Sequence, residues 1–247
     1  MDLFAALALP LMIVLGTVVG VRIVVRARED HSLPELSVGL ALIAFCAVTQ
    51  PLSLARVALE GRLTADAHAM LQVIPALSAA FAGICLYLFT WRVFRPLAPW
   101  AALLFAGGSA LALWAAAGTA TLAFYQSEFQ PNLTGRWIAV SALSFAVCFA
   151  WASCESLVYW ARLRRRLRLG LAEPLLVNRF LLWGIACSFS FTIDIVLTGY
   201  AWTGIDFNKD ETVRVLVSVS SLVQAVAWYL GFTPPAWYAR RFRARVR

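Results

Sequence analysis

Seven long apolar segments, separated by short polar breaks, constrain this chain more than any other feature. A helix that crosses a lipid bilayer needs roughly 20 mostly apolar residues. Hydrophobic residues make up 62% of the 247-residue chain and charged residues only 14%, whereas a soluble domain carries about 25% charged residues. We therefore predict an all-α membrane protein, a seven-transmembrane-helix bundle. The predicted spans are 3–25, 36–59, 67–91, 97–124, 137–160, 177–200 and 213–232.

The domain organisation follows from the same segments. Seven spans use most of the chain and leave only short loops, so residues 1–233 form one transmembrane domain. Pro234 and Pro235 end the last helix because proline cannot continue one. Residues 234–247 are then a basic cytoplasmic juxtamembrane tail.

The basic residues predict the orientation, because lysine and arginine concentrate in cytoplasmic loops. With the N-terminus outside, 16 of the 21 basic residues fall on the cytoplasmic side and 5 on the outer side. We expect a multi-pass protein of the plasma (inner) membrane. The cytoplasmic residues are Arg22, Arg26, Arg28, Arg92, Arg95, Arg162, Arg164, Arg165, Arg166, Arg168, Arg179, Arg240, Arg241, Arg243, Arg245 and Arg247, and the outer ones are Arg56, Arg62, Arg136, Lys209 and Arg214.

The loop after the fifth span is the most basic segment. Leu163, Leu167 and Leu171 recur every four residues between its arginines, which predicts a helical extension with an apolar stripe. Such a segment binds anionic headgroups or docks a partner helix; the alternative is that its charges only set the topology. Because the arginines cluster just beyond helix ends, we expect no nucleic acid partner. The residues assigned to lipid headgroups or a protein partner are Arg162, Arg164, Arg165, Arg166, Arg168, Arg240 and Arg241.

Two carboxylates fall within the predicted spans, and ionisable groups at membrane depth are candidate functional residues. Glu155 lies on one helical face with Ser141, Ser144, Cys148 and Trp151, and we expect an ion pair with Arg179. Asp194 lies on a face with Trp183, Cys187 and Ser190, and Arg214 or Arg56 could neutralise it.

The other polar residues of the spans complete a candidate ligand site. The last span has a stripe of Arg214, Ser218, Ser221, Gln224 and Trp228. Gln50 precedes Pro51, which predicts a kink with freed backbone groups. We expect a polar, partly aromatic interior shared by the second, fifth, sixth and seventh spans; the alternative is that these residues only pack the helices. The candidate ligand-binding residues are Glu155, Asp194, Gln50, Trp151, Ser190, Ser221 and Gln224.

Several known chemistries conflict with the residues available. The only lysine, Lys209, is in a loop and cannot form a retinal Schiff base, and His31 and His68 lie at opposite membrane edges and cannot clamp a haem. Only Asp194 is available where aspartyl intramembrane proteolysis needs two aspartates. The five cysteines all lie in apolar segments, and none forms a CxxC pair. We expect no enzyme activity, no cofactor and no metal.

Two stretches carry a resemblance to a known group of proteins. Residues 170–184 (GLAEPLLVNRFLLWG) and 228–237 (WYLGFTPPAW) resemble the multi-helix membrane sensor regions of bacterial signalling proteins. In those proteins the sensor region precedes a histidine kinase or cyclase, and the LGFxPP stretch marks the exit from the last helix. The sequence reaches Arg247 without such an output domain, so the resemblance implies either a sensor that signals through a separate cytoplasmic partner or a fragment of a longer signalling protein.

The leading hypothesis is a membrane-embedded sensory or accessory module that binds a small amphipathic ligand or a lipid. A proton-coupled transporter that uses Asp194 or Glu155 is the first alternative. A structural subunit of a membrane complex is the second.

Overall fold

The computed structural model describes residues 3–59, 61–125, 131–203 and 210–243, and all regular structure within them is helical. Seven spans are long and apolar enough to cross a membrane, and each overlaps one predicted span. Lys209, Arg245 and Arg247, which entered the charge count, lie outside the described residues. The elements are α1 (Leu3–Glu29), α2 (Leu33–Ile43), the π-helix η1 (Ala44–Thr49), α3 (Gln50–Ala58), α4 (Ala65–Phe94), α5 (Pro99–Tyr125), α6 (Pro131–Arg168), α7 (Pro174–Thr203), α8 (Glu211–Phe232) and α9 (Ala236–Arg243).

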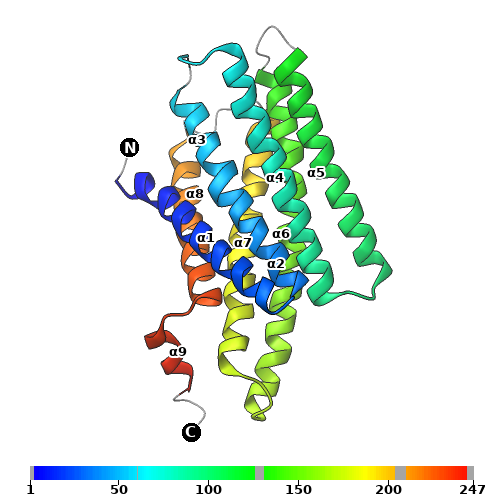
Figure 1. Ribbon diagram of the computed structural model, residues 1–247, viewed down its shortest axis with the longest axis vertical. Coiled ribbons are helices and arrows are strands. Elements are labelled where there is room, and N and C mark those ends of the chain that lie inside the picture. The colour runs from blue at the N-terminus through cyan, green and yellow to red at the C-terminus, as the bar shows by residue number, and fades with distance from the viewer. Residues whose placement is uncertain (1–2, 60, 126–130, 204–209, 244–247) are drawn as a thin grey trace.

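Six spans form a ring, and α5 packs outside it. Helix α1 contacts both α2 and α8, α8 contacts α7, and α7 packs most extensively on α6. Helix α4 closes the ring between α6 and the span made of α2, η1 and α3. Helix α5 lies against α4 and α6 at the edge of the bundle (Figure 1).

The two ends of the bundle differ in charge. One end carries the α1–α2, α4–α5 and α6–α7 turns together with α9 (Figure 1). We call it the arginine-rich end, because Arg92, Arg95, Arg240, Arg241 and the arginines at the end of α6 lie there.

Local sequence signals explain where several helices begin and end. Thr64 caps α4 by accepting a hydrogen bond from the Ala67 amide, and Asp210 caps α8 by accepting from the amides of Thr212 and Val213. Asp210 also accepts a hydrogen bond from the Tyr200 hydroxyl, and this bond and the amide bonds lower the pKa of Asp210 below its usual value. Both caps are residue types that satisfy free amides at helix N-termini.

The second span is interrupted, as the Gln50-Pro51 pair predicts. Proline removes an amide donor and crowds the preceding turn, and the turn before it widens into η1. The Ala44 carbonyl accepts hydrogen bonds from Thr49 Oγ1 at 3.1 Å and from Ser78 Oγ of α4 at 2.9 Å. Helix α4 has its own internal proline, Pro75, on the side facing this break, where Thr49 Oγ1 approaches its carbonyl at 3.5 Å.

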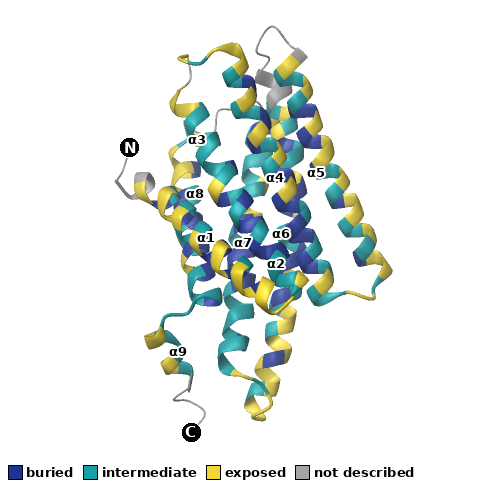
Figure 2. Ribbon diagram, viewed as in Figure 1, coloured by how far each residue is buried: buried dark blue, intermediate teal, exposed yellow. Residues whose placement is uncertain are grey.

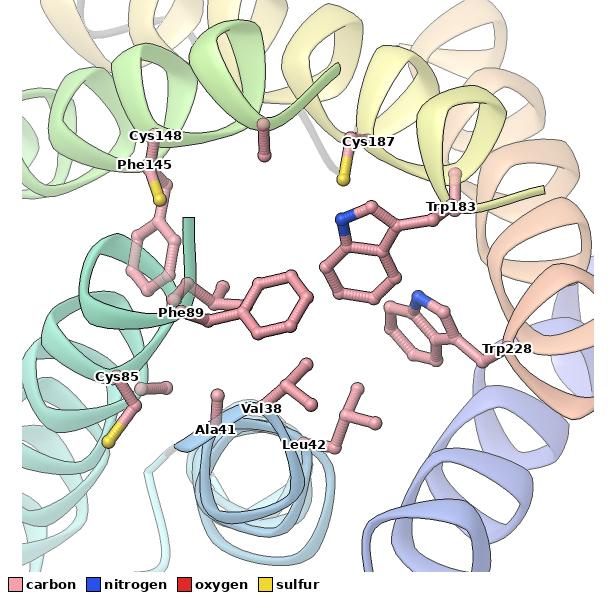
Figure 3. Close-up of a cluster of buried hydrophobic side chains, with 14 of the residues drawn as sticks. Val38, Ala41, Leu42, Cys85, Phe89, Phe145, Cys148, Trp183, Cys187 and Trp228 are labelled. Carbon is pink, nitrogen blue, oxygen red and sulfur yellow. The ribbon is translucent and has the colours of Figure 1, made fainter. Parts of the chain in front are cut away.

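The centre of the ring is apolar and aromatic. Phe89 of α4, Trp183 of α7 and Trp228 of α8 point into it (Figure 3), and the Trp183 and Phe89 ring centroids are 5.5 Å apart. Val38 and Leu42 of α2 close the core from the other side. Buried residues concentrate in this middle layer, while the outward helix faces are exposed (Figure 2).

This core corrects the predicted interior in two respects. Helix α4, which the prediction left out, supplies several core residues, among them Tyr87 and Phe89. Aromatic rings rather than polar groups fill the centre. The physical reason is that backbone carbonyls satisfy most of the buried serines. Ser190 donates to Ala186 at 3.0 Å and Ser218 to Arg214 at 2.8 Å within their own helices, and Ser144 donates to Gly108 of α5 at 3.2 Å, so these hydroxyls need no polar channel.

Replacing Gly108 by alanine should destabilise the bundle by about 1–3 kcal/mol. A Cβ at Gly108 of α5 would lie 2.2 Å from the ring of Tyr87, which is completely buried and donates a hydrogen bond from its hydroxyl to the Ser144 carbonyl. The midpoint of thermal unfolding in detergent measures the effect.

The neighbouring Gly107→Ala substitution is the matched control, because a Cβ there has no atom within 4 Å. It should leave the midpoint unchanged or raise it slightly, since alanine favours helix over glycine. Equal midpoints for the two variants would contradict the described packing of α5 on α4.

Candidate functional site

The α6–α7 hairpin is the most tightly packed pair in the bundle, and it positions the candidate site. Ser153 Oγ lies 2.6 Å from Ser188 Oγ and donates to the Gly184 carbonyl at 3.1 Å. A Cβ at Gly184 would lie 2.7 Å from Leu157, so the two helices approach closely there. In an antiparallel pair with this register, Asp194 of α7 lies level with the turn of α6 around Cys148.

The Asp194 carboxylate has no hydrogen bond or ion pair with any other described side chain. Its Oδ2 atom is fully enclosed and unbonded within the described part of the chain, although the residue as a whole is only partly buried. It lies within electrostatic reach of Cys148. As predicted, Trp183, Cys187 and Ser190 share its helical face, and all three are buried. A buried carboxyl oxygen left unbonded costs about 1–3 kcal/mol or more, so this atom is suited to accept a proton or a hydrogen bond.

Helix α8 carries another buried polar atom without a hydrogen bond to a described residue, at about the depth of Asp194. The Tyr200–Asp210 hydrogen bond at one end and the Arg179 Nε bond to the Gly231 carbonyl, 2.9 Å, at the other fix the register of α7 against α8. In this register, Ser220 of α8 lies level with Ser190 of α7. Ser190 is one helical turn from Asp194 along α7. The Ser220 hydroxyl is completely buried and has no hydrogen bond.

We call Asp194, Cys148, Cys187 and Ser190 the Asp194 patch. This patch can accept a hydrogen bond at the carboxylate. Ser220 was not among the sequence-based candidates, because it falls outside the stripe of Ser218, Ser221 and Gln224 along α8. A helical stripe identifies one face only, and Ser220 lies beside it.

The two predicted neutralising partners of Asp194 are elsewhere. Arg214 is exposed at the start of α8, and Arg56 is half-buried near the end of α3. Among the described residues, neither forms an ion pair with Asp194; the two ion pairs found there are Arg26–Asp30 and Arg95–Glu155. A polar stripe on one helix cannot show which residue pairs with Asp194, because that depends on the register between neighbouring helices.

Glu155 pairs with Arg95, and the predicted pair with Arg179 is wrong. The Arg95 Nε to Glu155 Oε1 distance is 2.8 Å, and this bond raises the pKa of the Arg95 guanidinium. Arg179 instead bonds the Gly231 carbonyl and lies over the Phe232 ring, 5.8 Å from its centroid. Arg95 directly follows α4, which contacts α6, whereas the register set by the Ser153–Ser188 contact places Arg179 about two helical turns from Glu155.

Trp151 belongs to an aromatic row beside this ion pair. Its ring centroid lies 5.9 Å from that of Trp100 and 6.4 Å from that of Tyr87. Arg95 lies 5.9 Å from the Trp100 ring centroid. The Trp151 Nε1 atom is buried without a hydrogen bond. The row and the ion pair tie α4, α5 and α6 together.

The remaining candidate residues are spread over the bundle. Ser221 and Gln224 are buried on α8, whereas Gln50 lies half-buried at the junction of η1 and α3, a span that contacts α1 and α4. The structure therefore brings Ser190 to Asp194, but it places Glu155, Trp151 and Gln50 in other regions.

The basic segment of α6 exposes its arginines and buries part of its leucine stripe. Leu163 is 5% exposed and packs inward, so the stripe begins as an internal contact. Leu171, past the end of α6, is 73% exposed. Helix α9, which the sequence did not predict, lies beside the hairpin, where Asn178 Nδ2 donates to the Tyr238 hydroxyl at 2.7 Å. The exposed arginines are Arg162, Arg164, Arg165, Arg166, Arg168, Arg240 and Arg241.

Within the described ranges, no group of three or more His, Cys, Asp or Glu residues could hold a metal ion. No protein-family model matches the chain, and neither a curated protein nor a solved structure does.

Replacing Arg95 by glutamine should lower the thermal midpoint in detergent more than replacing Glu155 by glutamine. The Glu155 side chain is 13% exposed and that of Arg95 38%. Without Arg95, a shielded carboxylate has no cation; without Glu155, the guanidinium still reaches solvent. An unpaired shielded charge is the costlier of the two.

The double variant tests whether the two effects share one cause. Arg95→Gln with Glu155→Gln should recover part of the midpoint lost in Arg95→Gln alone, because it leaves no charge behind. A double variant less stable than Arg95→Gln would show that the residues act separately.

Proposed function

We propose that this chain is a membrane-embedded sensory or accessory module whose sensing site is the Asp194 patch. Its ligand is a small amphipathic molecule or part of a lipid that brings a hydrogen-bond donor to the carboxylate. The arginine-rich end faces the cytoplasm and signals through a separate protein partner.

The unbonded Asp194 Oδ2 atom is the observation that carries this proposal. Membrane proteins keep few carboxylates at such depth, and those they keep mark pathways and ligand sites. Glu155 is satisfied by Arg95, so it has no comparable unused capacity. A ligand with an amine or hydroxyl group would complete the hydrogen bonding at Asp194 and gain affinity from it.

Helix α7 supplies a physical connection from the patch to the arginine-rich end. Asp194 lies on α7, and the same helix carries Arg179, which bonds α8, and Asn178, which bonds α9. Its tight contact with α6 extends the connection to the exposed arginines. A ligand that shifts α7 would therefore move the surface that a partner contacts, provided the ligand prefers one position of the helix.

A proton-coupled carrier is the second candidate, and the interrupted helices favour it. The η1 break and Pro75 of α4 face each other, joined by the Ser78 hydrogen bond to the Ala44 carbonyl. Carriers commonly build their sites from such discontinuous helices. Asp194 would then be the group that takes up and releases the proton, although it lies on the opposite side of the core.

Chemical cross-linking in native membranes, with mass spectrometry of what is attached, tests the leading proposal. A partner should be recovered through the α6 surface, and the charge reversal Arg162→Glu/Arg164→Glu/Arg165→Glu should reduce its yield. Asp194→Asn should also change the yield, although Asp194 lies several turns along α7 from the arginine-rich end and does not belong to the α6 surface. Thr192→Val on the exposed side of α7 is the matched control and should have no effect.

Other outcomes would overturn the sensor proposal. A stoichiometric membrane partner whose yield ignores Asp194→Asn would indicate a structural subunit. Recovery of the protein alone, with proton-coupled flux in liposomes that Asp194→Asn abolishes, would indicate a carrier.

A further inference from the structure

Two neighbouring spans are interrupted by proline at the same level of the bundle. Pro51 follows η1 in the second span, and Pro75 lies inside α4 in the third. Thr49 Oγ1 lies 3.5 Å from the Pro75 carbonyl. Ser78 Oγ of α4 donates to the Ala44 carbonyl of η1 at 2.9 Å, so the two breaks lie side by side. Because proline removes a helical hydrogen bond at each break, the two breaks can act as one hinge.

We call α3 together with residues 65–74 of α4 the proline hairpin. It lies beyond both breaks, at the end of the bundle opposite the arginine-rich end (Figure 1). No residue of α3 is buried, and the buried residues among 65–74 are Ala69 and Val73. On the other side of the break in α4, most of residues 79–90 are buried. The described residues from 47 to 78 contribute no side chain to the hydrophobic core of the ring, so little core packing holds the proline hairpin.

The other half of each of these two spans is held firmly. A Cβ at Gly39 of α2 would lie 2.8 Å from Val24 of α1, and a Cβ at Gly20 would lie 3.0 Å from the Gly39 carbonyl oxygen. Helices α1 and α2 therefore approach closely, whereas α3 packs mainly on α4. In α4, Tyr87 is completely buried, and its hydroxyl donates to the Ser144 carbonyl of α6 at 2.8 Å. On the arginine-rich side of the breaks, both spans are thus anchored to neighbours in the ring.

The hinge lies at about the level of Asp194. The rings of Phe89 on α4 and Trp183 on α7 are in contact, with their centroids 5.5 Å apart. Ser78, at the hinge, precedes Phe89 by 11 residues, and Asp194 follows Trp183 by 11 residues. Because α4 and α7 run in opposite directions and both rise by the same amount per residue, Ser78 and Asp194 lie at about the same depth. The proline hairpin therefore borders the half of the ring between Asp194 and the end opposite the arginines.

We propose that the proline hairpin is a hinged lid on this half of the ring. It swings about Pro51 and Pro75 as one body, because α3 packs on α4, and a hinge needs only a few residues that change their backbone angles. The open position gives access to the level of Asp194 from the end opposite the arginines, and the closed position covers it. The lid's role at the Asp194 patch rests on the proposed function, whereas its movement does not.

Double electron–electron resonance of the full-length protein in lipid nanodiscs tests the lid, with Cys154→Ser removing the exposed native cysteine. The hairpin pair of spin labels is Met70→Cys on α4 with Val215→Cys on α8. The matched core pair is Phe81→Cys with Val226→Cys on the same two helices, and all four positions are exposed. The hairpin pair should give a distance distribution at least about twofold wider than that of the core pair, because a hinged element occupies more than one position while a packed core does not deform.

The variant Pro51→Ala/Pro75→Ala should narrow the hairpin pair to the width of the core pair, since alanine restores the amide donor that each helix lacks. The core pair also reports whether this variant keeps its fold. Pro99→Ala is the matched control and should leave both distributions unchanged, because Pro99 is the first residue of α5, where a missing amide donor costs nothing.

Two results would overturn the lid. Equal widths of the two pairs in the unmodified protein would show that the proline hairpin is as fixed as the core. A wide hairpin pair that the double proline substitution leaves unchanged would show that the prolines are not its hinge. Both pairs are measured without a ligand, so the lid and the sensor proposal can fail separately.

Discussion

The structure depends on one constraint, which is that the hydrocarbon core offers no hydrogen-bonding partner to a protein. Backbone groups must therefore be satisfied within helices, and polar side chains within the bundle. Where Pro51 disrupts the second span, Thr49 and Ser78 satisfy the Ala44 carbonyl. Ser190 bonds to its own helix for the same reason. Six buried side-chain atoms of the described residues depart from this pattern and have no hydrogen bond, and Asp194 Oδ2 is the only carboxylate oxygen among them.

The α6–α7 hairpin connects the Asp194 patch to the arginine-rich end. Its two helices pack closely through the Ser153 hydrogen bond and at Gly184. Because the bonds of Arg179 and Asn178 join α7 to α8 and α9, a ligand at Asp194 that shifts α7 would also shift the surface at this end.

Much of the fold could be predicted from the sequence, but little of the site could. The length of an apolar segment depends only on the thickness of the bilayer, so the sequence predicted all seven spans. The Gln50-Pro51 pair predicted the break in the second span. The stripes on α6, α7 and α8 correctly gave their buried faces. The partner of Glu155 and the surroundings of Asp194 depend on the register and order of the helices in the ring, which no single-helix pattern contains. Helix α9 was missed because its eight residues read as a charged tail.

The proposed function requires that seven helices cross the membrane with the arginine-rich end in the cytoplasm, and cysteine accessibility measures this arrangement. With Cys154, the exposed native cysteine, replaced by serine, a new cysteine at Arg62 or at Leu169 reports opposite ends of the bundle. A membrane-impermeant maleimide applied to intact cells should label Arg62→Cys at once and Leu169→Cys only after permeabilisation. Labelling of Leu169→Cys in intact cells would invert the orientation, and labelling of both positions from the same side would contradict the seven-span arrangement itself.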